Sequence, residues 1–356
     1  MTRPKPVPDR SLPAPREISG PADRKAEHIR LALDPRMQPV KNYFDDYRFE
    51  HQALPELDYD AIDLSCSFLG RDLAAPLLIS CMTGGTPEAA RINRNLALAA
   101  QAMGIAVGVG SQRKALEDPS TMDDFRIRPY APSVPILANL GAVQLNYGYG
   151  LEQCRRAVAM IEADALVLHL NPLQEVIQPE GQRNFAGLLD KIGHIAGHLE
   201  VPLIVKEVGC GISRAVAEKL MRVGVRVVDT AGAGGTSWAR IEAERARDAG
   251  LGDLFADWGI PTPVAIRKLS EVPGLTIIGS GGIRHGIDAA KALAAGAHLV
   301  GMAYRFLRSA NESTEAVVQR VRRVLEELRM SMFCAGAGTL EKLRQTRLHP
   351  VGGFFE

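Results

Sequence analysis

Short apolar runs recur along the chain from residue 76 onward, and segments with helical spacing separate them. Each run is continuous rather than alternating with polar residues, which is typical of parallel strands covered on both faces. The expected strands lie at 76–80, 105–110, 135–141, 165–171, 202–208, 225–232, 275–282 and 298–303. The expected helices lie at 89–103, 150–163, 213–224, 286–297 and, as a closing helix, 314–332.

This repeated order of strand and helix is compatible with two α/β folds. Eight units over about 230 residues match a (β/α)8 TIM barrel, which usually needs about 250 residues. A doubly wound sheet would instead show a GxGxxG motif after its first strand, with an acidic residue about 20 positions later. The segment Cys81–Thr86 does not satisfy that pattern. We therefore predict an α/β fold, a (β/α)8 TIM barrel with an N-terminal extension.

The chain is expected to divide into the barrel and three flanking segments. Residues 1–20 are rich in proline and polar side chains and are predicted to form a flexible N-terminal extension. Residues 21–75 are predicted to pack on the barrel and reach the active site. The barrel itself is expected to span 76–345, and 346–356 is expected to be a C-terminal tail.

Two segments outside the regular pattern also carry local predictions. The stretch 22–33 has helical spacing, and Asp23 is placed as its N-cap. The gap at 233–274 is the longest between expected strands. It predicts a long active-site loop followed by a helix that begins near Pro263.

Composition excludes several classes of protein. With 46% hydrophobic and 23% charged residues, the chain has the make-up of a globular protein with a sizeable core. A formal net charge of +1 argues against a nucleic-acid surface, which usually needs a strongly basic face. The five cysteines are scattered without a CxxC pair, which favours a reducing compartment over disulfides or zinc. There is no signal-peptide pattern and no apolar run of about 20 residues, so we predict a cytoplasmic protein without membrane segments.

Glycine-rich and polar clusters coincide with the ends of the expected strands, where TIM barrels carry their active sites. After the seventh run, GSGGIRHG places Gly281 and Gly282 just before a helix. Backbone N–H groups and the positive end of that helix would face an anion there. The position predicts a phosphorylated cofactor or substrate, and FMN is a candidate because its ring would lie over the barrel mouth.

The fourth run ends in HLNPLQE, which brings His169, Gln174 and Glu175 to the barrel mouth. Glu175 and His169 could bind a metal ion or act as acid and base. One carboxylate beside a diphosphate suffices for Mg²⁺, since phosphates and waters complete its octahedron. Alternatively, Glu175 caps the next turn in solvent and His169 is a core histidine.

Two further groups of charged residues have both a functional and a structural interpretation. Lys206 ends the fifth run and could stabilise negative charge on a flavin ring or form a Schiff base. It could equally pair with a neighbouring carboxylate, while Glu207 beside it could point out of the barrel. In the segment RKAEH, the residues Arg24, Lys25 and His28 either are solvated or fold over the mouth to hold an anionic substrate.

Taken together, the motifs resemble those of one family. RKAEH, MTGG, GSQR, HLNPLQE, KEVGCGIS, DTAGAGGTSW and GSGGIRHGIDAAKALAAGA occur in this order between residues 22 and 345, as in the type 2 isopentenyl-diphosphate isomerases. The resemblance implies an FMN-dependent barrel enzyme of isoprenoid biosynthesis that interconverts isopentenyl diphosphate and dimethylallyl diphosphate. Cys81 and Ala231 depart from the pattern, because a smaller residue and a hydroxyl are common there. Residues 1–20 have no counterpart in the family.

The resemblance also implies a role for the residues of each motif. The residues that it implies for the flavin are Met82, Thr83, Gly84, Ser111, Asn139, Lys206, Thr236, Gly282, Ile283, Arg284, Ala303 and Tyr304. Those that it implies for the substrate are Arg24, Lys25, His28, Arg113, His169 and Gln174. Gln174 would lie next to the reacting carbons as a catalytic residue, and Glu175 would bind the Mg²⁺ that bridges the diphosphate.

By the same resemblance, the reaction is a 1,3-allylic proton shift in which reduced FMN is the acid/base. NADPH or another reductant primes the flavin, and a dry pocket stabilises a carbocation-like state. The expected partners are the small-molecule diphosphate substrate and further copies of the chain, as a homo-oligomer that is a tetramer or an octamer. Trp238, Arg240 and Glu242 in the sixth loop are expected to reach a neighbouring subunit.

Three alternatives remain open. An FMN-dependent oxidase of 2-hydroxy acids would need a histidine base with an adjacent arginine after the sixth strand, where this chain has GAGGTSWAR. A barrel of the inosine-monophosphate dehydrogenase type would need a nucleophilic cysteine in that loop, where Thr236 and Ser237 stand. A non-catalytic flavin-binding barrel would bind ligand without turnover and would leave Gln174 and Glu175 without a role.

Overall fold

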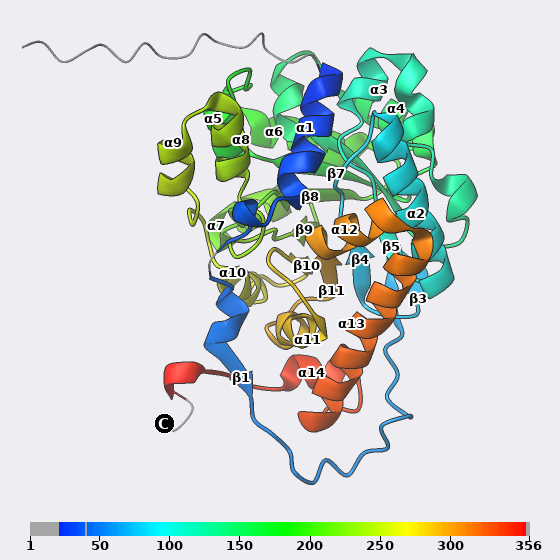
Figure 1. Cartoon of the computed structure of the whole chain (residues 1–356), viewed down its shortest axis with the longest axis vertical. Helices are drawn as coiled ribbons and strands as arrows, with labels where there is room; N and C mark the ends of the chain where they lie inside the picture. Colours follow the sequence, from blue (N-terminus) through cyan, green and yellow to red (C-terminus); the bar gives the residue numbers. More distant parts are fainter. Residues whose placement is uncertain (1–20, 40, 354–356) are drawn as a thin grey trace, which may run out of the picture.

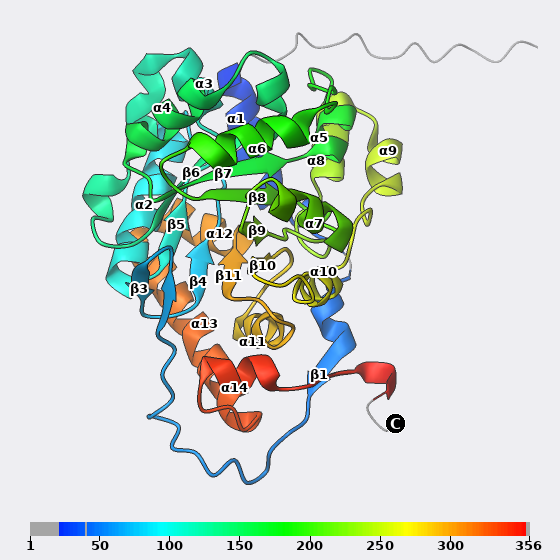
Figure 2. The same cartoon turned by 180° about the vertical axis from the view of Figure 1, so that it is seen from behind.

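Eight parallel strands close into a barrel in the computed structural model, which describes residues 21–39 and 41–353 (Figure 1, Figure 2). The barrel strands are β4 (Leu77–Ile79), β5 (Ala106–Gly108), β6 (Ile136–Gly141), β7 (Ala165–Leu170), β8 (Leu203–Glu207), β9 (Val227–Asp229), β10 (Thr276–Ser280) and β11 (Leu299–Met302). They follow one another round the barrel in chain order, and β11 pairs in parallel with β4 to close it. The predicted (β/α)8 TIM barrel is thereby confirmed. The predicted extension at 1–20 lies outside the described residues.

Side chains of the strands alternate between the barrel interior and the surrounding helices, as the period of a strand requires. In β4, Leu78 belongs to the interior cluster, whereas Leu77 and Ile79 belong to the cluster that includes the helices. In β7, Val167 is interior, so His169 two positions later also faces the barrel axis. Each strand has one further inward-facing residue, two positions after its residue in the interior cluster and just above the apolar interior. These residues are Ser80, Gly108, Asn139, His169, Lys206, Asp229, Ser280 and Gly301.

Helices connect the strands and cover the outside of the barrel (Figure 1). They are α2 (Pro87–Met103), α3 (Arg113–Glu117), α4 (Leu151–Ile161), α5 (Pro172–Ile177), α6 (Leu188–His198), α7 (Arg214–Arg222), α10 (Thr262–Leu269), α11 (Gly286–Ala294), α12 (Tyr304–Glu312), α13 (Thr314–Cys334) and α14 (Leu340–Gln345). Short 3-10 helices are η3 (Pro119–Asp124), η4 (Arg128–Tyr130) and η5 (Ala142–Asn146). The helix expected near Pro263 is α10, and the expected closing helix is α13. No helix in the described part of the chain is long and apolar enough to cross a membrane.

The prediction of a long loop within 233–274, before the helix near Pro263, is wrong. This segment contains α8 (Trp238–Ala246) and α9 (Ala249–Leu254). Ser237 caps α8 by accepting a hydrogen bond from the N–H of Arg240. The stretch WARIEAERA is rich in alanine, glutamate and arginine, which have high helix propensity. The prediction gave too little weight to this propensity and to the serine cap.

The N-terminal segment contacts both ends of the barrel. Helix α1 (Pro21–Leu33) lies over the mouth, where it contacts α8 and α12 (Figure 1). Asp23 lies inside α1 and not at its N-cap, because the helix already includes Pro21. At the opposite end, the hairpin of β2 (Cys66–Phe68) and β3 (Arg71–Leu73) adds Phe68 and Leu73 to the interior cluster.

The end of the chain is joined to the N-terminal segment by a second small sheet. In it, β12 (Leu348–Pro350) pairs antiparallel with β1 (Tyr47–Phe49). The flanking 3-10 helices are η1 (Pro35–Met37), η2 (Tyr43–Asp46) and η6 (Val351–Gly353). Within the segment expected to be a C-terminal tail, residues 348–353 form β12 and η6.

Candidate active site

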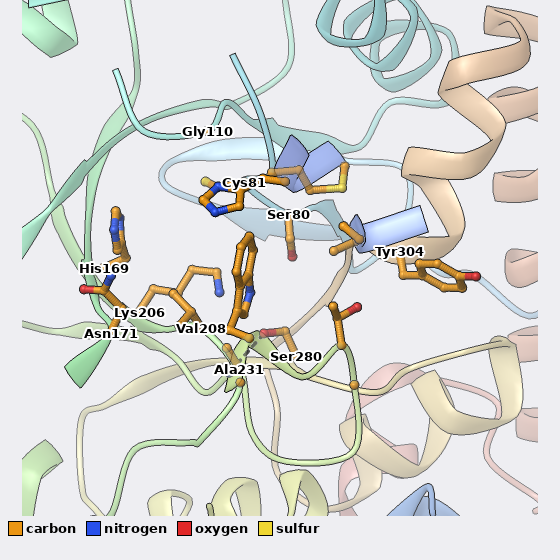
Figure 3. A pocket seen from close by; sticks show the side chains of 18 of the residues that line it. Ser80, Cys81, Gly110, His169, Asn171, Lys206, Val208, Ala231, Ser280 and Tyr304 are labelled. Carbon is orange, nitrogen blue, oxygen red and sulfur yellow. Dashed lines mark hydrogen bonds between the residues drawn. The ribbon is translucent and has the colours of Figure 1, made fainter. Parts of the chain in front are cut away.

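A deep cavity of about 420 Å³ opens at the carboxyl ends of the barrel strands (Figure 3). Its volume falls within the range of about 300–1,000 Å³ that is usual for small-molecule sites. The residues implied for the flavin, the substrate and the metal all line it, except Gly84. A Cβ atom at Gly84 would lie 2.0 Å from the ring of Phe125, so Gly84 supports the MTGG turn from behind the cavity.

One corner of the cavity is built from two glycine-rich loops, after β9 and β10. Gly281 and Gly282 have φ angles of +105° and +72°, which side chains other than glycine rarely adopt. A Cβ atom at Gly282 would lie 2.2 Å from the carbonyl oxygen of Gly234. The two loops thus pack backbone against backbone. Gly282 lies four residues before Gly286, the first residue of α11. Backbone N–H groups gathered at a helix N-terminus fit a phosphate group, and the phosphate site itself stays a prediction.

Two side chains beside this corner have other partners than expected. Arg284, implied for the flavin phosphate, places its guanidinium between Asp45, at 2.6 Å, and the fully buried Asp288, at 3.0 Å. The two carboxylates therefore neutralise the charge of Arg284. Through Asp45, Arg284 also connects the N-terminal segment to the glycine-rich loop after β10. The Thr236 hydroxyl accepts a hydrogen bond of 2.9 Å from the amide of Gln38, which sequence reasoning missed.

The centre of the cavity fits the ring of a flavin. The hydroxyl of Ser80 is buried, lines the cavity and has no hydrogen-bond partner in the described structure, so it is free for a polar atom of a ring. Lys206 is 8% exposed, and its ammonium donates a 2.6 Å hydrogen bond to the carbonyl of Glu207. Behind it lies Asp229, 2% exposed, which accepts a hydrogen bond from the Ser280 hydroxyl. Burial raises the pKa of Asp229, while the charge of Lys206 opposes that rise.

Glu207 has a structural role. One of its carboxylate oxygens accepts hydrogen bonds from the backbone N–H groups of four successive residues, 208–211. By strand alternation from Val205 it lies on the outer side of β8, which agrees with the interpretation that it points out of the barrel. The carboxylate therefore fixes the loop after β8, which includes the cavity residues Val208 and Gly209.

Four cations gather at another part of the mouth: Arg24, Lys25, Arg113 and Lys114. Lys25 lies on α1 and donates to the carbonyl of Ser111 at 3.2 Å. Burial, together with the neighbouring charges of Arg24, Lys114 and Arg113, lowers the pKa of Lys25 to about 8. An anion bound here would relieve this repulsion, so the group is suited to a diphosphate.

His169 is uncharged at neutral pH. Burial lowers its pKa to about 3, with smaller contributions from the charges of Lys206 and Lys25. Its Nδ1 donates to the side-chain oxygen of Asn139 at 2.9 Å, since an amide oxygen can only accept. His169 can therefore contribute a hydrogen bond to a ligand in the cavity but no positive charge.

Glu175 is a single buried carboxylate at the cavity wall. It is 8% exposed, and its oxygens accept hydrogen bonds from the Asn171 amide at 2.9 Å and from the N–H of Gln182 at 2.6 Å. Among the residues that the structure describes, no group of three or more His, Cys, Asp or Glu side chains could hold a metal ion. One carboxylate fits Mg²⁺ only where phosphate oxygens and waters complete the coordination shell.

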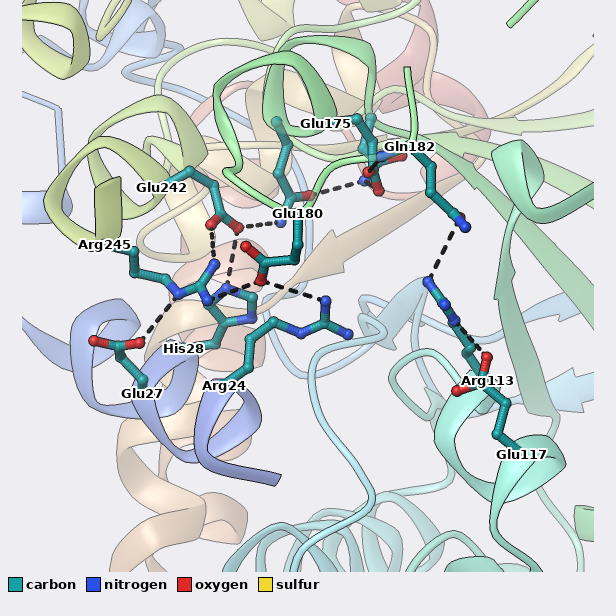
Figure 4. A network of polar contacts seen from close by, with 12 residues as sticks. Arg24, Glu27, His28, Arg113, Glu117, Glu175, Glu180, Gln182, Glu242 and Arg245 are labelled. Atoms are coloured by element: carbon teal, nitrogen blue, oxygen red, sulfur yellow. Dashed lines mark hydrogen bonds and ion pairs between the residues drawn. The ribbon is translucent and has the colours of Figure 1, made fainter. Parts of the chain in front are cut away.

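The partner of Gln174 was not predicted from the sequence. The Gln174 amide donates to the carboxylate of Glu242 at 2.7 Å, and Glu242 also meets His28 at 3.0 Å and Arg245 at 2.6 Å (Figure 4). Burial opposes ionisation of Glu242, but its contact with His28, the hydrogen bond from Gln174 and the charge of Arg245 hold its pKa below its usual value.

The three residues expected to reach a neighbouring subunit all have contacts within this chain, and their contact with another subunit stays a prediction. Glu242 is fully buried, and the ring of Trp238 packs edge-on against His28 with centroids 5.3 Å apart. Arg240 pairs with Asp253 at 3.2 Å. The spacing of Glu242 and Arg245 on one helix could have indicated an ion pair, but only the fold brings that pair to α1.

Comparisons with known proteins agree with this geometry. A family profile described as FMN-dependent dehydrogenase matches residues 169–350. The isopentenyl-diphosphate delta-isomerase of Nostoc sp. is 52% identical over 91% of this chain and 94% of its own. The enzymes of the same name from Cronobacter sakazakii and Rickettsia prowazekii are 51% and 45% identical, over 93% and 94% of this chain and 97% and 99% of theirs. The chain belongs to the isopentenyl-diphosphate delta-isomerase family. The predicted family and the predicted isomerase class are both confirmed.

Solved structures of FMN barrels share the fold. A lactate oxidase from Pediococcus acidilactici superposes with a TM-score of 0.64 at 16% identity, covering 93% of both chains. A mandelate oxidase variant with an FMN adduct superposes with a TM-score of 0.60 at 17% identity, covering 91% of this chain and 92% of its own. At such low identity these structures support the TIM barrel and not a shared substrate.

Proposed function

We propose that this protein is an FMN-dependent isopentenyl-diphosphate delta-isomerase, which interconverts isopentenyl diphosphate and dimethylallyl diphosphate in isoprenoid biosynthesis. One observation carries the proposal. A single cavity joins a glycine-lined phosphate corner to a cluster of four cations that lies beside one buried carboxylate. The first suits the phosphate of a flavin, and the second suits a diphosphate with its divalent cation.

The side chains around the cavity divide the work of binding between them. Arg24, Lys25 and Arg113 would hold the diphosphate, and Glu175 would hold Mg²⁺ on it. Trp238 and Ala231 form an apolar part of the wall, which helps to exclude water from the hydrocarbon end. Gln174, fixed by Glu242, would lie next to that end.

The chemistry is a 1,3-allylic proton shift without net redox change. Reduced FMN, when bound, supplies the acid/base group for this shift. Lys206 would hold its buried positive charge beside the ring, where it favours the electron-rich form. Neutral His169 uses its single N–H for Asn139, so it would orient ligands as a hydrogen-bond acceptor and not protonate them.

The alternative oxidase activity lacks its base. The cavity residues after β9, from Ala231 to Thr236, include no histidine, whereas oxidation of a 2-hydroxy acid needs one to take the hydroxyl proton.

The flavin reductant NADPH, the tetrameric or octameric state and the cytoplasmic location stay predictions from the sequence. Five free cysteines, four of which are not exposed, fit a reducing compartment.

An anaerobic turnover assay tests the proposal. Protein supplied with FMN, NADPH and Mg²⁺ should convert isopentenyl diphosphate to dimethylallyl diphosphate, and omission of the reductant or of Mg²⁺ should abolish conversion. The absence of dimethylallyl product would overturn the proposal. Oxidation of lactate or mandelate with release of hydrogen peroxide in air would favour the oxidase alternative.

A further inference from the structure

A short segment after α5 connects the two parts of the diphosphate site. We call residues 178–182 the strap; Figure 4 shows its Glu180 side chain extending toward Arg24 and Arg245, and its Gln182 side chain extending toward Arg113. The strap turns tightly, since the N–H of Gly181 donates to the carbonyl of Gln178 at 3.0 Å. The N–H of Gln178 in turn donates to the carbonyl of Gln174 at 2.8 Å.

Gln182 joins the metal carboxylate to one of the arginines. Its backbone N–H donates to Glu175 at 2.6 Å, and its side-chain oxygen accepts from Gln144 at 2.8 Å. The same side-chain oxygen lies 3.5 Å from the guanidinium of Arg113. The two short contacts anchor the residue, while the long contact to Arg113 can re-form around a ligand.

Glu180 repeats this arrangement on the other side. Its carboxylate accepts from Arg245 at 2.9 Å and lies 3.5 Å from Arg24 on α1. Arg245 is 5% exposed and is itself held by Glu242 and by Glu27. Here too a short contact to a buried residue anchors the strap, and a longer contact reaches a residue that lines the cavity, Arg24.

Gly181 brings the strap directly against the backbone of Glu175. A Cβ atom at Gly181 would lie 1.8 Å from the carbonyl oxygen of Glu175 and 3.0 Å from that of Gln178. This close packing gives a displacement of the Glu175 backbone a direct route to Glu180 and Gln182 on either side of Gly181. Both arginine contacts would shift with it.

We propose that the strap couples divalent-cation binding at Glu175 to diphosphate binding by Arg24 and Arg113, with Gln182 as a positioning residue. The inference rests on the proposed function. A cation that fixes Glu175 fixes the strap, and the strap then holds both arginines in the positions that grip the diphosphate. By linkage, the diphosphate must tighten the binding of the cation by the same factor.

The coupling can be measured without catalysis. Inorganic diphosphate is titrated calorimetrically into the FMN-loaded protein with and without saturating Mg²⁺, with correction for the magnesium–diphosphate complex in solution. In the wild type we expect Mg²⁺ to tighten diphosphate binding by about tenfold or more. In Gln182→Ala we expect this factor to fall by roughly fivefold, as one lost hydrogen bond allows. Gly181→Ala should act in the same direction.

A matched control separates coupling from general damage. Gln101 also uses its amide in hydrogen bonds, to Ser133 on the far side of α2, so Gln101→Ala should keep the wild-type factor. A merely structural role of Gln182 would weaken diphosphate binding equally with and without Mg²⁺. Unchanged coupling in Gln182→Ala overturns the inference and leaves the proposed function intact. If Gly181→Ala does not fold, Gln182→Ala decides. No diphosphate binding by the wild type overturns the proposed function and the inference with it.

Discussion

The side-chain amide of Gln174 donates a hydrogen bond of 2.7 Å to the fully buried carboxylate of Glu242. At its other end, the amide oxygen of Gln174 accepts a hydrogen bond of 3.1 Å from Asn171. The amide is thereby held in one orientation at the cavity wall. Because Glu242 also pairs with His28 and Arg245, it links Gln174 to the helix that covers the barrel mouth.

Replacement of Glu242 by glutamine should separate this link from the binding of FMN. The amide keeps the shape but leaves Arg245 with a weaker partner, so we expect kcat to fall about 10–100-fold, the cost of roughly 1.4–2.8 kcal/mol in positioning. FMN content should stay at the wild-type level. Steady-state kinetics and flavin absorbance measure the two effects. Glu244→Gln, an exposed change two residues further on, is the control, and an unchanged kcat in Glu242→Gln would contradict the prediction.

The lowered pKa of Lys25 predicts a pH dependence of substrate affinity. In the free protein Lys25 is protonated below a pKa of about 8, so its charge is lost as the pH rises through that value. A bound diphosphate favours the protonated form and raises the pKa of Lys25 in the complex. We therefore expect KM to rise above about pH 8 while kcat stays level. Lys25→Arg cannot titrate in this range and should give a KM that is flat from pH 7 to 9. A flat profile in the wild type would refute the assignment.

Glu175→Gln should affect the metal and spare the flavin. The amide keeps an oxygen but loses the negative charge that Mg²⁺ prefers, so the Mg²⁺ concentration for half-maximal activity should rise by about tenfold or more. FMN content should not change, because Glu175 belongs to the other part of the cavity. A Mg²⁺ titration of activity provides the measurement. Full activity at limiting Mg²⁺ would place the metal elsewhere.

Gly282→Ala should weaken FMN binding. Alanine is strained at a φ of +72°, and its Cβ would meet the carbonyl of Gly234 at 2.2 Å, so the two phosphate loops must separate. We expect the Kd for FMN to rise by about tenfold or more, equal to about 1.4 kcal/mol. Fluorescence of free and bound flavin measures it. Gly197→Ala, where a Cβ meets nothing within 4 Å, is the control, and equal Kd values in both variants would show that this corner does not hold the phosphate.

Much of the site could be predicted because strand period and barrel topology act together. Once Val167 is interior, His169 must be interior too, and barrel closure brings it near Lys206 of the next strand. The roles of individual side chains were less predictable. Arg284 was expected at a phosphate, yet Asp45 from the N-terminal segment neutralises it. No local pattern shows a partner 239 positions away.

By itself, the sequence determined the barrel, its eight strands and the motifs at their carboxyl ends, because continuous apolar runs and glycine-rich turns are local signals of buried strands and their connections. The tertiary structure alone decided which charges remain free for a ligand. Glu242 was expected in a loop that reaches a neighbouring subunit, but packing of α1 over the mouth buries it against Gln174, His28 and Arg245. The physical reason is that burial and pairing set the free energy of a charge, and both depend on segments far apart in the chain.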